Sequence, residues 1–432
     1  MGTRAVDSAG FAAPFAASVP LHRGLAMKKL LIALLLLVPQ IRVPAAPAPD
    51  IEIVESIPVG TTLDNPEIRN TQEVWLEMIG RARKTLDLEQ YYISDESGKR
   101  LEAVLAAIDA AAGRGVKVRV LVDARMYRTY PASVDKLAQR PNIEVRRIDF
   151  GPIAGGIQHA KYFIVDGREV FVGSQNFDWR ALEHIHELGL RISDSQIAAA
   201  YGDVFDLDWR LASLAPEAIK TFSVPRKTYR IPIRVAGAEG QVAFLCPTFS
   251  PLGFIPDPAL WDERAIVELV DGSQRSLSLQ FLSYSPADRQ GDRYAEIDDA
   301  LRRAAKRGVK VRMIVSDWEK GSSAVAALKD LAEVPNIEVA FTAIPEWSGG
   351  YIPFARVEHC KYIVADGAKF WLGTSNCEKS YFYGSRNLGI VCTSPNLAGA
   401  LSNIFLKSWN SPYKELITKS GEYPPREHGE KK

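Results

Sequence analysis

The chain contains the same polar pattern twice, and the two copies are in register. Residues 158–166 read QHAKYFIVD, and residues 358–366 read EHCKYIVAD. The pattern continues with GSQN at 173–176 and with GTSN at 373–376. His159 and His359 are separated by 200 residues (359 − 159), and so are the lysines, aspartates and asparagines of the two copies. The chain is therefore expected to fold as two lobes that build one active site from both copies.

Hydrophobic periodicity predicts an α/β fold for each half. The first half is predicted as helix 71–84, strand 85–93, helix 98–114, strand 116–122, helix 132–139 and strand 143–148, and the second half repeats this order between 261 and 341. Strands that alternate with helices are typical of layered α/β domains. We expect two pseudo-symmetric α/β sandwich lobes with the active site at their interface. Their predicted bounds are 47–214 and 251–412, with a connector at 215–250 and a polar tail at 413–432.

Residues 1–46 resemble an extension followed by an export signal. Met27, Lys28 and Lys29 precede nine apolar residues at 30–38, and the small-residue run VPAA lies at 43–46. A basic segment, a short apolar segment and a small-residue cleavage site are typical of secretory signals. A transmembrane helix needs about 20 apolar residues, so this segment is too short to span a bilayer. We predict an exported protein, periplasmic or extracellular.

Charge and cysteine content place few demands on function. Beyond residue 46 the chain holds 48 basic and 51 acidic residues (53 − 5 and 52 − 1), a balance of −3. This balance gives no positive argument for a polyanionic partner. No pair among the four cysteines has C-x-x-C spacing, so a zinc ribbon is not indicated. One disulfide and buried free thiols are both compatible with the sequence.

The two copies predict a cationic pocket rich in hydrogen-bond donors. Residues i and i+2 of a strand point to one face, so His159 and Lys161 are expected to emerge together, with Ala160 directed into the core. The next strand returns a hydroxyl and an amide beside them. The predicted residues of the two sets are His159, Lys161, Ser174 and Asn176, and His359, Lys361, Thr374 and Asn376. The hydroxyls are assigned to substrate binding, and no metal or other cofactor is required.

These side chains suit phosphodiester transfer. One imidazole attacks phosphorus and forms a phosphohistidine, and the other protonates the leaving oxygen and then activates water. The lysines and asparagines stabilise the charge on the non-bridging oxygens. Glu187 is expected to orient the ring of His159, whereas the equivalent position after His359 is Asn387. This asymmetry favours His159 as the nucleophile and His359 as the acid and base.

Asp166 and Asp366 complete the catalytic candidates, but each directly precedes a glycine. Capping of a turn is the commoner role for an aspartate in that position. His184 and His186 form a His-x-His pair that could bind a metal, yet no second cluster accompanies it. We therefore expect these two histidines to support the site or to lie on the surface.

Two tyrosines are expected to border the pocket. Tyr91 and Tyr351 lie near strand ends that should face it, so they are predicted to bind substrate by stacking on a base or by contacting acyl chains. Packing in the core is the commoner role for any single aromatic ring.

The doubled H-x-K-x4-D pattern with a trailing G-[ST]-x-N resembles the phospholipase D superfamily over most of residues 51–410. NFDWR at 176–180, ELG at 187–189 and IPFARVEH at 352–359 are similar to the branch of lysosomal phospholipase-D-like 5′ exonucleases and poxvirus envelope relatives. The resemblance implies a metal-independent phosphohistidine mechanism that uses the His, Lys and Asn of both copies. It also implies single-stranded nucleic acid or phospholipid as the substrate.

Three functions follow from these observations. The chain could be an exported phosphodiesterase for single-stranded nucleic acid, a phospholipase D, or a catalytically idle binding or coat protein that kept the fold. Both copies retain His, Lys and Asp, which argues against the idle protein. Transient contact with a membrane and a homodimer are compatible with the sequence.

Overall fold

The computed structural model describes residues 50–237, 241–288 and 290–430. The predicted leader at 1–46 lies outside these residues. Within the described ranges, no helix combines the length and apolar character that crossing a membrane requires.

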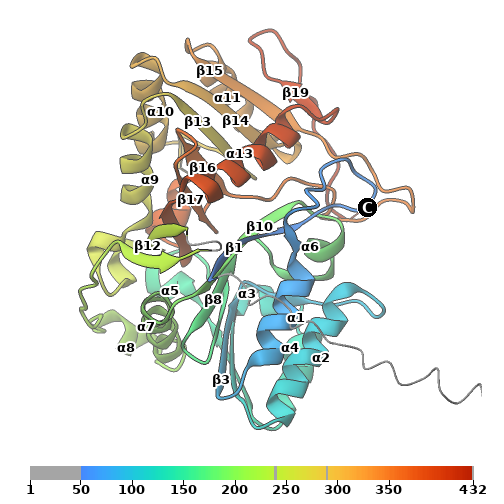
Figure 1. Cartoon of the computed structure of the whole chain (residues 1–432), viewed down its shortest axis with the longest axis vertical. Helices are drawn as coiled ribbons and strands as arrows, with labels where there is room; N and C mark the ends of the chain where they lie inside the picture. The colour runs from blue at the N-terminus through green and yellow to red at the C-terminus, as the bar shows by residue number, and fades with distance from the viewer. Residues whose placement is uncertain (1–49, 238–240, 289, 431–432) are drawn as a thin grey trace, which may run out of the picture. The chain divides into compact units, whose positions relative to one another are not determined.

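The first lobe is built on an eight-stranded mixed sheet with the order β2-β1-β10-β8-β7-β3-β5-β6 (Figure 1). Its strands are β1 (Ile51–Ser56), β2 (Arg69–Asn70), β3 (Thr85–Gln90), β5 (Lys117–Asp123), β6 (Ile143–Ile148), β7 (Lys161–Val165), β8 (Glu169–Gly173) and β10 (Glu187–Ser193). Its helices are α1 (Thr71–Arg81), α2 (Arg100–Gly113), α3 (Ala124–Thr129), α4 (Ala132–Ala138), α5 (Phe150–Ala154), α6 (Trp179–Glu183), α7 (Ser195–Leu211) and α8 (Pro216–Lys220). A short separate ladder joins β4 (Ile93–Ser94) to β9 (Phe177–Asp178).

The second lobe repeats this arrangement in a nine-stranded sheet with the order β11-β12-β18-β17-β16-β13-β14-β15-β19. Its strands are β11 (Ile233–Ala236), β12 (Val242–Ser250), β13 (Ser276–Phe281), β14 (Lys310–Ser316), β15 (Ile337–Thr342), β16 (Tyr362–Ala365), β17 (Lys369–Gly373), β18 (Asn387–Thr393) and β19 (Lys414–Leu416). Its helices are α9 (Asp262–Asp271), α10 (Glu296–Lys306), α11 (Ala324–Ala332), α12 (Lys379–Tyr383) and α13 (Pro395–Trp409). In spatial order, the seven strands β1-β10-β8-β7-β3-β5-β6 of the first sheet correspond to the seven strands β12-β18-β17-β16-β13-β14-β15 of the second. This correspondence confirms the predicted pair of α/β lobes.

Two predicted boundaries are wrong. Strands β11 and β12 lie inside the predicted connector 215–250, yet β12 pairs with β18 just as β1 pairs with β10. The predicted polar tail also joins the sheet, because β19 pairs with β15 and the nearby ring of Tyr423 is buried. The edge strands β11 and β19 have only four and three residues in which to show alternation, and Pro247 interrupts the pattern of the longer β12, so local sequence did not reveal their partners.

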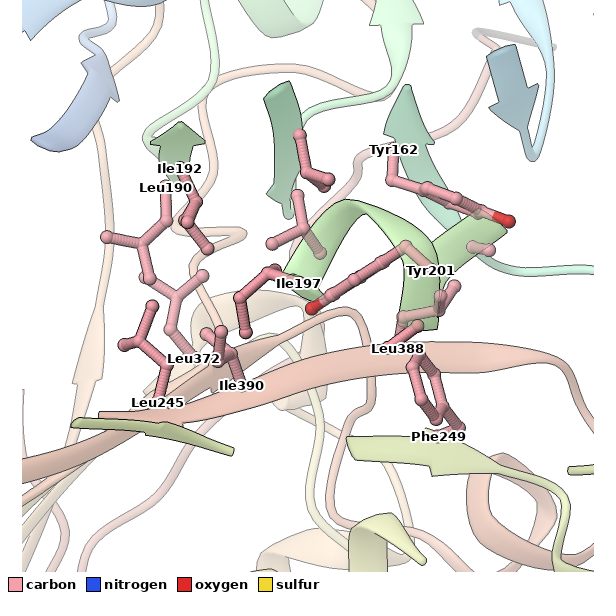
Figure 2. Close-up of a cluster of buried hydrophobic side chains, with 14 of the residues drawn as sticks. Tyr162, Leu190, Ile192, Ile197, Tyr201, Leu245, Phe249, Leu372, Leu388 and Ile390 are labelled. Atoms are coloured by element: carbon pink, nitrogen blue, oxygen red, sulfur yellow. The ribbon is translucent and has the colours of Figure 1, made fainter. Parts of the chain in front are cut away.

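A shared core joins the two lobes. Helix α7 packs its apolar face, which includes Ile197 and Tyr201, toward β17 and β18 of the other lobe (Figure 2). Leu372, Leu388 and Ile390 meet that face, and the Tyr201 hydroxyl donates to the Gly389 carbonyl at 2.8 Å. Helix α13, which is absent from the predicted elements, touches β1 of the first lobe in the same way. The core thus fixes the two motif copies against each other.

Candidate active site

The two motif copies meet across the lobe interface. The Nδ1 atom of His159 lies 2.9 Å from Oδ1 of Asn387, and Nδ1 of His359 lies 2.8 Å from Oε2 of Glu187. The chain segments that carry these groups also pair, because the His159 N–H donates to the Arg386 carbonyl at 2.9 Å. Each imidazole is therefore oriented by a residue of the opposite lobe.

Glu187 was expected to orient His159, and this expectation is wrong. Its carboxylate accepts from His359, while His159 faces the Asn387 amide oxygen. The reason is the interface itself, since residues 157–159 run beside 385–387 and residues 185–187 run beside 357–359. Pairing within one sequence repeat could not reveal a partner supplied by the other repeat.

In both rings Nδ1 is occupied by a partner, which fixes the chemistry of the other nitrogen. Nδ1–H of His159 donates to the Asn387 oxygen, so Nε2 of His159 keeps a lone pair for reaction. In the His359–Glu187 pair one proton lies between Nδ1 and the carboxyl group, which leaves Nε2 of His359 as the nitrogen that carries the transferable proton. Burial lowers the pKa of His159, and the neighbouring ammonium groups of Lys161 and Lys361 lower it further. His159 is therefore a neutral imidazole near neutral pH.

The Glu187–His359 pair behaves differently because it contains a carboxyl group. Burial raises the pKa of Glu187 to about 8, whereas burial and the two lysine ammonium groups lower the pKa of His359. Near neutral pH the pair therefore holds one proton more than a neutral imidazole beside an ionised carboxylate would. The His159–Asn387 pair has no second acidic group in which to store a proton.

Both lysines are anchored beside the histidines. The ammonium of Lys161 donates to the His159 carbonyl at 2.7 Å, and that of Lys361 donates to the His359 carbonyl at 2.5 Å. Burial lowers the pKa of Lys361 to about 8, and burial together with the Lys361 charge lowers the pKa of Lys161. Two buried ammonium groups whose positive charges are not fully balanced by nearby carboxylates favour an anionic ligand between them. Ala160 points into the core as predicted, and so does the corresponding Cys360 of the second copy.

The hydroxyls of Ser174 and Thr374, which were predicted to bind substrate, instead bond the residues that orient the two imidazoles. The Thr374 hydroxyl donates to Asn387 Oδ1 at 2.9 Å. Ser174 is the corresponding partner of the Glu187 carboxylate and also exchanges hydrogen bonds with the Leu188 main chain. Both hydroxyls are fully buried. They orient the partners of the two imidazoles, so their assignment to substrate binding is corrected.

The two asparagines retain open hydrogen-bonding capacity. Within the described part of the chain, the side-chain oxygens of Asn176 and Asn376 are buried and have no hydrogen-bond partner. The Asn376 amide nitrogen donates to the Tyr381 hydroxyl at 3.1 Å. Buried amides with unused capacity are costly unless a ligand completes their bonding, which fits a role at the substrate.

Aromatic rings flank His159 on two sides. The Tyr91 ring lies 5.0 Å from the imidazole and 5.0 Å from the Lys161 ammonium, so this predicted residue is at the site. The Tyr381 ring also lies 5.0 Å from the imidazole, in an edge-on arrangement. Tyr381 was not predicted because the first copy has Ala181 at the matching position. The sequence feature that could have indicated Tyr381 is this difference between the two copies at an otherwise matching position.

Three predicted residues lie elsewhere. Asp166 follows the far end of β7, where its carboxylate accepts main-chain N–H groups of Arg83, Lys84 and Thr85. Asp366 binds residues 274–276 in the same manner. Their φ angles of 52° and 57° place them in Asp-Gly turns, so a catalytic role is replaced by the turn role. Tyr351 donates to the Gly429 carbonyl at 2.6 Å in the C-terminal segment.

The glycines of the motif permit close strand contact. A Cβ atom on Gly173 would lie 2.7 Å from the Cα of Gly189, and one on Gly373 would lie 2.8 Å from the Cα of Gly389. Real Cβ atoms do not approach other atoms so closely, so β8 and β17 each need glycine beside the strand that carries the partner of an imidazole. All four cysteines are free thiols.

Comparison with known proteins agrees with this geometry. A family profile described as "Cardiolipin synthase, PLD-like domain" matches residues 75–209 and 268–409, more than half of the chain. The chain belongs to the phospholipase D superfamily. The 5′-3′ exonuclease PLD3 of Bos taurus is 30% identical over 391 residues, which is 84% of this chain and 79% of the bovine protein.

Further members of the superfamily are similar in sequence or in fold. Phospholipase D Z of Dictyostelium discoideum is 29% identical over 397 residues, 85% of this chain and 91% of that protein. A crystal structure of phosphatidylserine synthase from Haemophilus influenzae Rd KW20 has a TM-score of 0.57 at 14% identity and covers 85% of this chain and 87% of that chain. That likeness shows the fold. The protein is an enzyme of the phosphodiesterase type, as the resemblance implied.

Proposed function

We propose that the protein is an exported, metal-independent phosphodiesterase that works through a phosphohistidine on His159, with His359 as general acid and base. The observation that carries the proposal is the crossed pairing of the imidazoles. Nδ1 of His159 meets an amide oxygen, whereas Nδ1 of His359 meets a carboxylate. The two rings are alike in position and different in their capacity to hold a proton.

This difference assigns the two roles. A nucleophile must be neutral when it attacks, and the hydrogen bond from His159 to the Asn387 amide favours the protonated ring less than burial and the two lysine charges disfavour it, so the pKa of His159 is lowered. A general acid must carry a proton, and the Glu187–His359 pair keeps one because burial raises the pKa of Glu187 to about 8. We therefore keep His159 as the proposed nucleophile, but for a different reason than the sequence suggested, since the carboxylate of Glu187 contacts the proposed acid.

The reaction proceeds in two balanced steps. Nε2 of His159 attacks phosphorus and forms a P–N bond, the P–O bond to the leaving group breaks, and the leaving oxygen takes a proton from His359. Water then attacks the phosphohistidine, His359 accepts a proton from that water, and the P–N bond breaks to release a phosphate monoester. Lys161 and Lys361 hold the non-bridging oxygens in both steps.

Single-stranded nucleic acid is the substrate that the ring positions favour. Tyr91 and Tyr381 each lie 5.0 Å from His159, so a base attached to the reacting phosphate would meet an aromatic ring. Stacking on an aromatic ring contributes about 1–3 kcal/mol per base and tolerates any sequence. The similarity to a 5′-3′ exonuclease supports the same choice.

A phospholipid is the second candidate, and a groove beside the site favours it. The groove has a volume of about 530 Å³, and its lining includes Gly156 and Gly384, which precede His159 and Asn387 by three residues in the chain. Asp288, Glu319 and Glu378 line it together with Lys379, whose ammonium pairs with Asp288 at 2.9 Å, so carboxyl groups outnumber ammonium groups there. These carboxylates would repel a polyanionic strand and would suit a cationic headgroup.

The first test is a parallel assay of the purified protein in the presence of a chelator. One arm contains 5′-hydroxyl single-stranded DNA and the other contains phospholipid vesicles. Mononucleotides released from the DNA end would support the exonuclease, and phosphatidic acid would support the phospholipase. Loss of activity on chelation would contradict the metal-independent mechanism.

A second test separates nucleophile from acid. The His359→Ala variant should still release a first equivalent of nitrophenolate from bis(4-nitrophenyl) phosphate, because nitrophenolate leaves without a proton, but should then turn over slowly because the base for the second step is missing. It should lose activity on DNA or lipid. The His159→Ala variant should be inactive on every substrate. Mass spectrometry after an alkaline quench should detect on His159 of the wild type a phosphoryl group that still carries one ester of the substrate, and the same group on His359 instead would reverse the assignment.

A further inference from the structure

Two short main-chain ladders join the lobes directly behind the imidazoles. The His359 N–H donates to the His186 carbonyl at 2.9 Å, and the His186 N–H donates to the Val357 carbonyl at 3.0 Å. The second ladder is equivalent, with the Arg386 N–H donating to the Ile157 carbonyl at 2.9 Å. Side chains alternate along extended chain, so His186 and Glu358 point away from the site while Glu187 and His359 point into it.

The side chains behind each ladder form a buried ion cluster. Arg386 donates to the two carboxylate oxygens of Asp208 at 2.5 and 2.7 Å, and both residues are fully buried. Gln158 reaches Glu89 at 3.2 Å, and the Tyr162 hydroxyl donates to Glu89 at 2.8 Å. This cluster lies behind His159 and Asn387.

The cluster behind His359 is built on His186, 200 residues before Arg386 (386 − 186). Nε2 of His186 lies 2.8 Å from Glu55 Oε1, and Nδ1 is hydrogen-bonded to Glu358. Glu358 also accepts from Gln280 at 2.5 Å and from Ser408 at 3.0 Å. Asn65 donates to Glu55 at 2.9 Å. A ring with a carboxylate at each nitrogen needs a proton on both, so His186 is an imidazolium.

The charges of this cluster agree with that protonation. Burial by itself lowers the pKa of His186, but the contacts with Glu358 and Glu55 outweigh it and raise the pKa to about 10. Cys360 lies close enough to complete a metal site with His186 and Glu358. Its thiol donates to the His186 carbonyl at 3.3 Å, however, and neither ring nitrogen has a free lone pair. Protons on both ring nitrogens of His186 therefore occupy the positions through which the ring would bind a metal ion.

We propose that His186 is a positioning residue for the general acid, held between Glu55 and Glu358 so that the adjoining Glu187 and His359 stay paired. Arg386, held by Asp208, is its counterpart for Asn387 and His159. Each member of the Glu187–His359 pair is one residue from a member of the buried ion cluster. If the main chain at Glu187 or His359 rotated, a charged hydrogen bond of the neighbouring His186 or Glu358 would have to break, and no water could replace it in this buried cluster. The expected loss of kcat rests on the proposed function, whereas the role of His186 in orienting Glu187 and His359 does not.

The test compares His186→Gln with the wild type in the full chain, with bis(4-nitrophenyl) phosphate and an unactivated diester such as a dinucleotide as probes. On the dinucleotide, kcat should fall about 10–100-fold with KM nearly unchanged, since displacement of a supporting partner misplaces the acid without removing it. On bis(4-nitrophenyl) phosphate the rate of the first nitrophenolate release should change less, because that departure needs no acid. His186→Lys should restore most of the rate, because an ammonium can donate to both carboxylates.

A second readout does not depend on turnover. Imidazole ¹⁵N spectra of the wild type should show His359 protonated on Nε2, the nitrogen that faces the substrate, and His186→Gln should give a mixture of tautomers. A wild type that cleaves neither probe would end the proposed function, while the spectra would still decide the positioning role. A variant that lowers only the melting temperature, with kcat and tautomer as in the wild type, would overturn the proposal.

Matched variants guard against a general effect of mutating this segment. His184→Phe alters a buried histidine two residues away, both of whose ring nitrogens lack a hydrogen-bond partner among the described residues. It should leave kcat unchanged. If His186→Gln does not fold, the triple variant with Glu55→Gln and Glu358→Gln removes the stranded charges. That variant should show the same loss of kcat, and wild-type kcat in it would also overturn the proposal.

Discussion

Nδ1 of His359 lies 2.8 Å from Oε2 of Glu187, although the two residues belong to different lobes. The matching contact, from Nδ1 of His159 to Oδ1 of Asn387, measures 2.9 Å. The site thus has the geometry of a symmetric dimer within one chain and the chemistry of an asymmetric pair. One oxygen belongs to an acid and the other to an amide, and this single difference separates a proton carrier from a nucleophile.

The Asn387→Asp variant should make His159 a worse nucleophile in mildly acidic solution. A carboxylate beside an imidazole raises its pKa by about 1–3 units because it stabilises the charged ring. More of His159 would then be protonated, and the acidic limb of the kcat/KM profile should move to higher pH. A pH–rate profile on bis(4-nitrophenyl) phosphate measures the shift. An unchanged acidic limb would contradict the assignment of the nucleophile.

The Glu187→Gln variant should lose the proton carried by the acid. General acid catalysis contributes about 10²–10⁴-fold, so kcat on an unactivated diester should fall within that range. Glu169→Gln provides the control, because Glu169 is also a buried carboxylate but bonds Arg191 at the far end of β8. Its kcat should match the wild type even if its stability falls. Equal losses in both variants would mean that the effect is structural.

The kcat/KM profile of the wild type should decline as the pH rises through about 8. Burial gives both Glu187 and Lys361 a pKa of about 8, so the stored proton and one phosphate-binding charge are lost together there. The acidic limb should lie below the ordinary histidine pKa of about 6.5, because burial and the lysine charges lower the pKa of His159. Initial rates over a broad pH range test both limbs, and activity that still rises above pH 8 would argue against this account.

The Asp166→Asn variant should weaken folding and spare the chemistry. Asparagine tolerates the positive φ of this turn, so the change isolates the carboxylate that accepts three main-chain N–H groups. The expected loss is about 1 kcal/mol at neutral pH, as for a lost helix cap. Although partial burial opposes it, these N–H groups lower the pKa of Asp166. The stabilisation is therefore present above the ordinary aspartate pKa of about 3.9 and disappears as the pH falls through the lower folded pKa.

Urea titrations of the wild type and Asp166→Asn at neutral and acidic pH measure this difference. The gap in unfolding free energy should close in acid. Asp366→Asn should behave alike, since Asp366 occupies the equivalent turn of the second lobe. A large loss of kcat in folded Asp166→Asn would return this aspartate to the catalytic set.

Local pattern was enough to find the elements that carry the motifs. The helix at 71–84 and the strand at 85–93 correspond to α1 and β3, and the strand expected to return beside the first motif is β8. These segments have strong periodicity because each buries one face in its own lobe. Strands β11, β12 and β19 were assigned to a connector and a tail, because their pairing depends on strands far away in the chain.

The sequence by itself determined that two equal sets of His, Lys and Asn exist, because the repeat of 200 residues is visible without any fold. Only the tertiary structure decided which residue orients which imidazole. Glu187 follows His159 in the chain but meets His359 in space, and Ser174 and Thr374 hold these partners rather than a substrate. Side-chain alternation is a property of one strand and can be read locally. Contacts across a pseudo-twofold interface arise only when two complete lobes have folded and packed, so no local pattern can encode them.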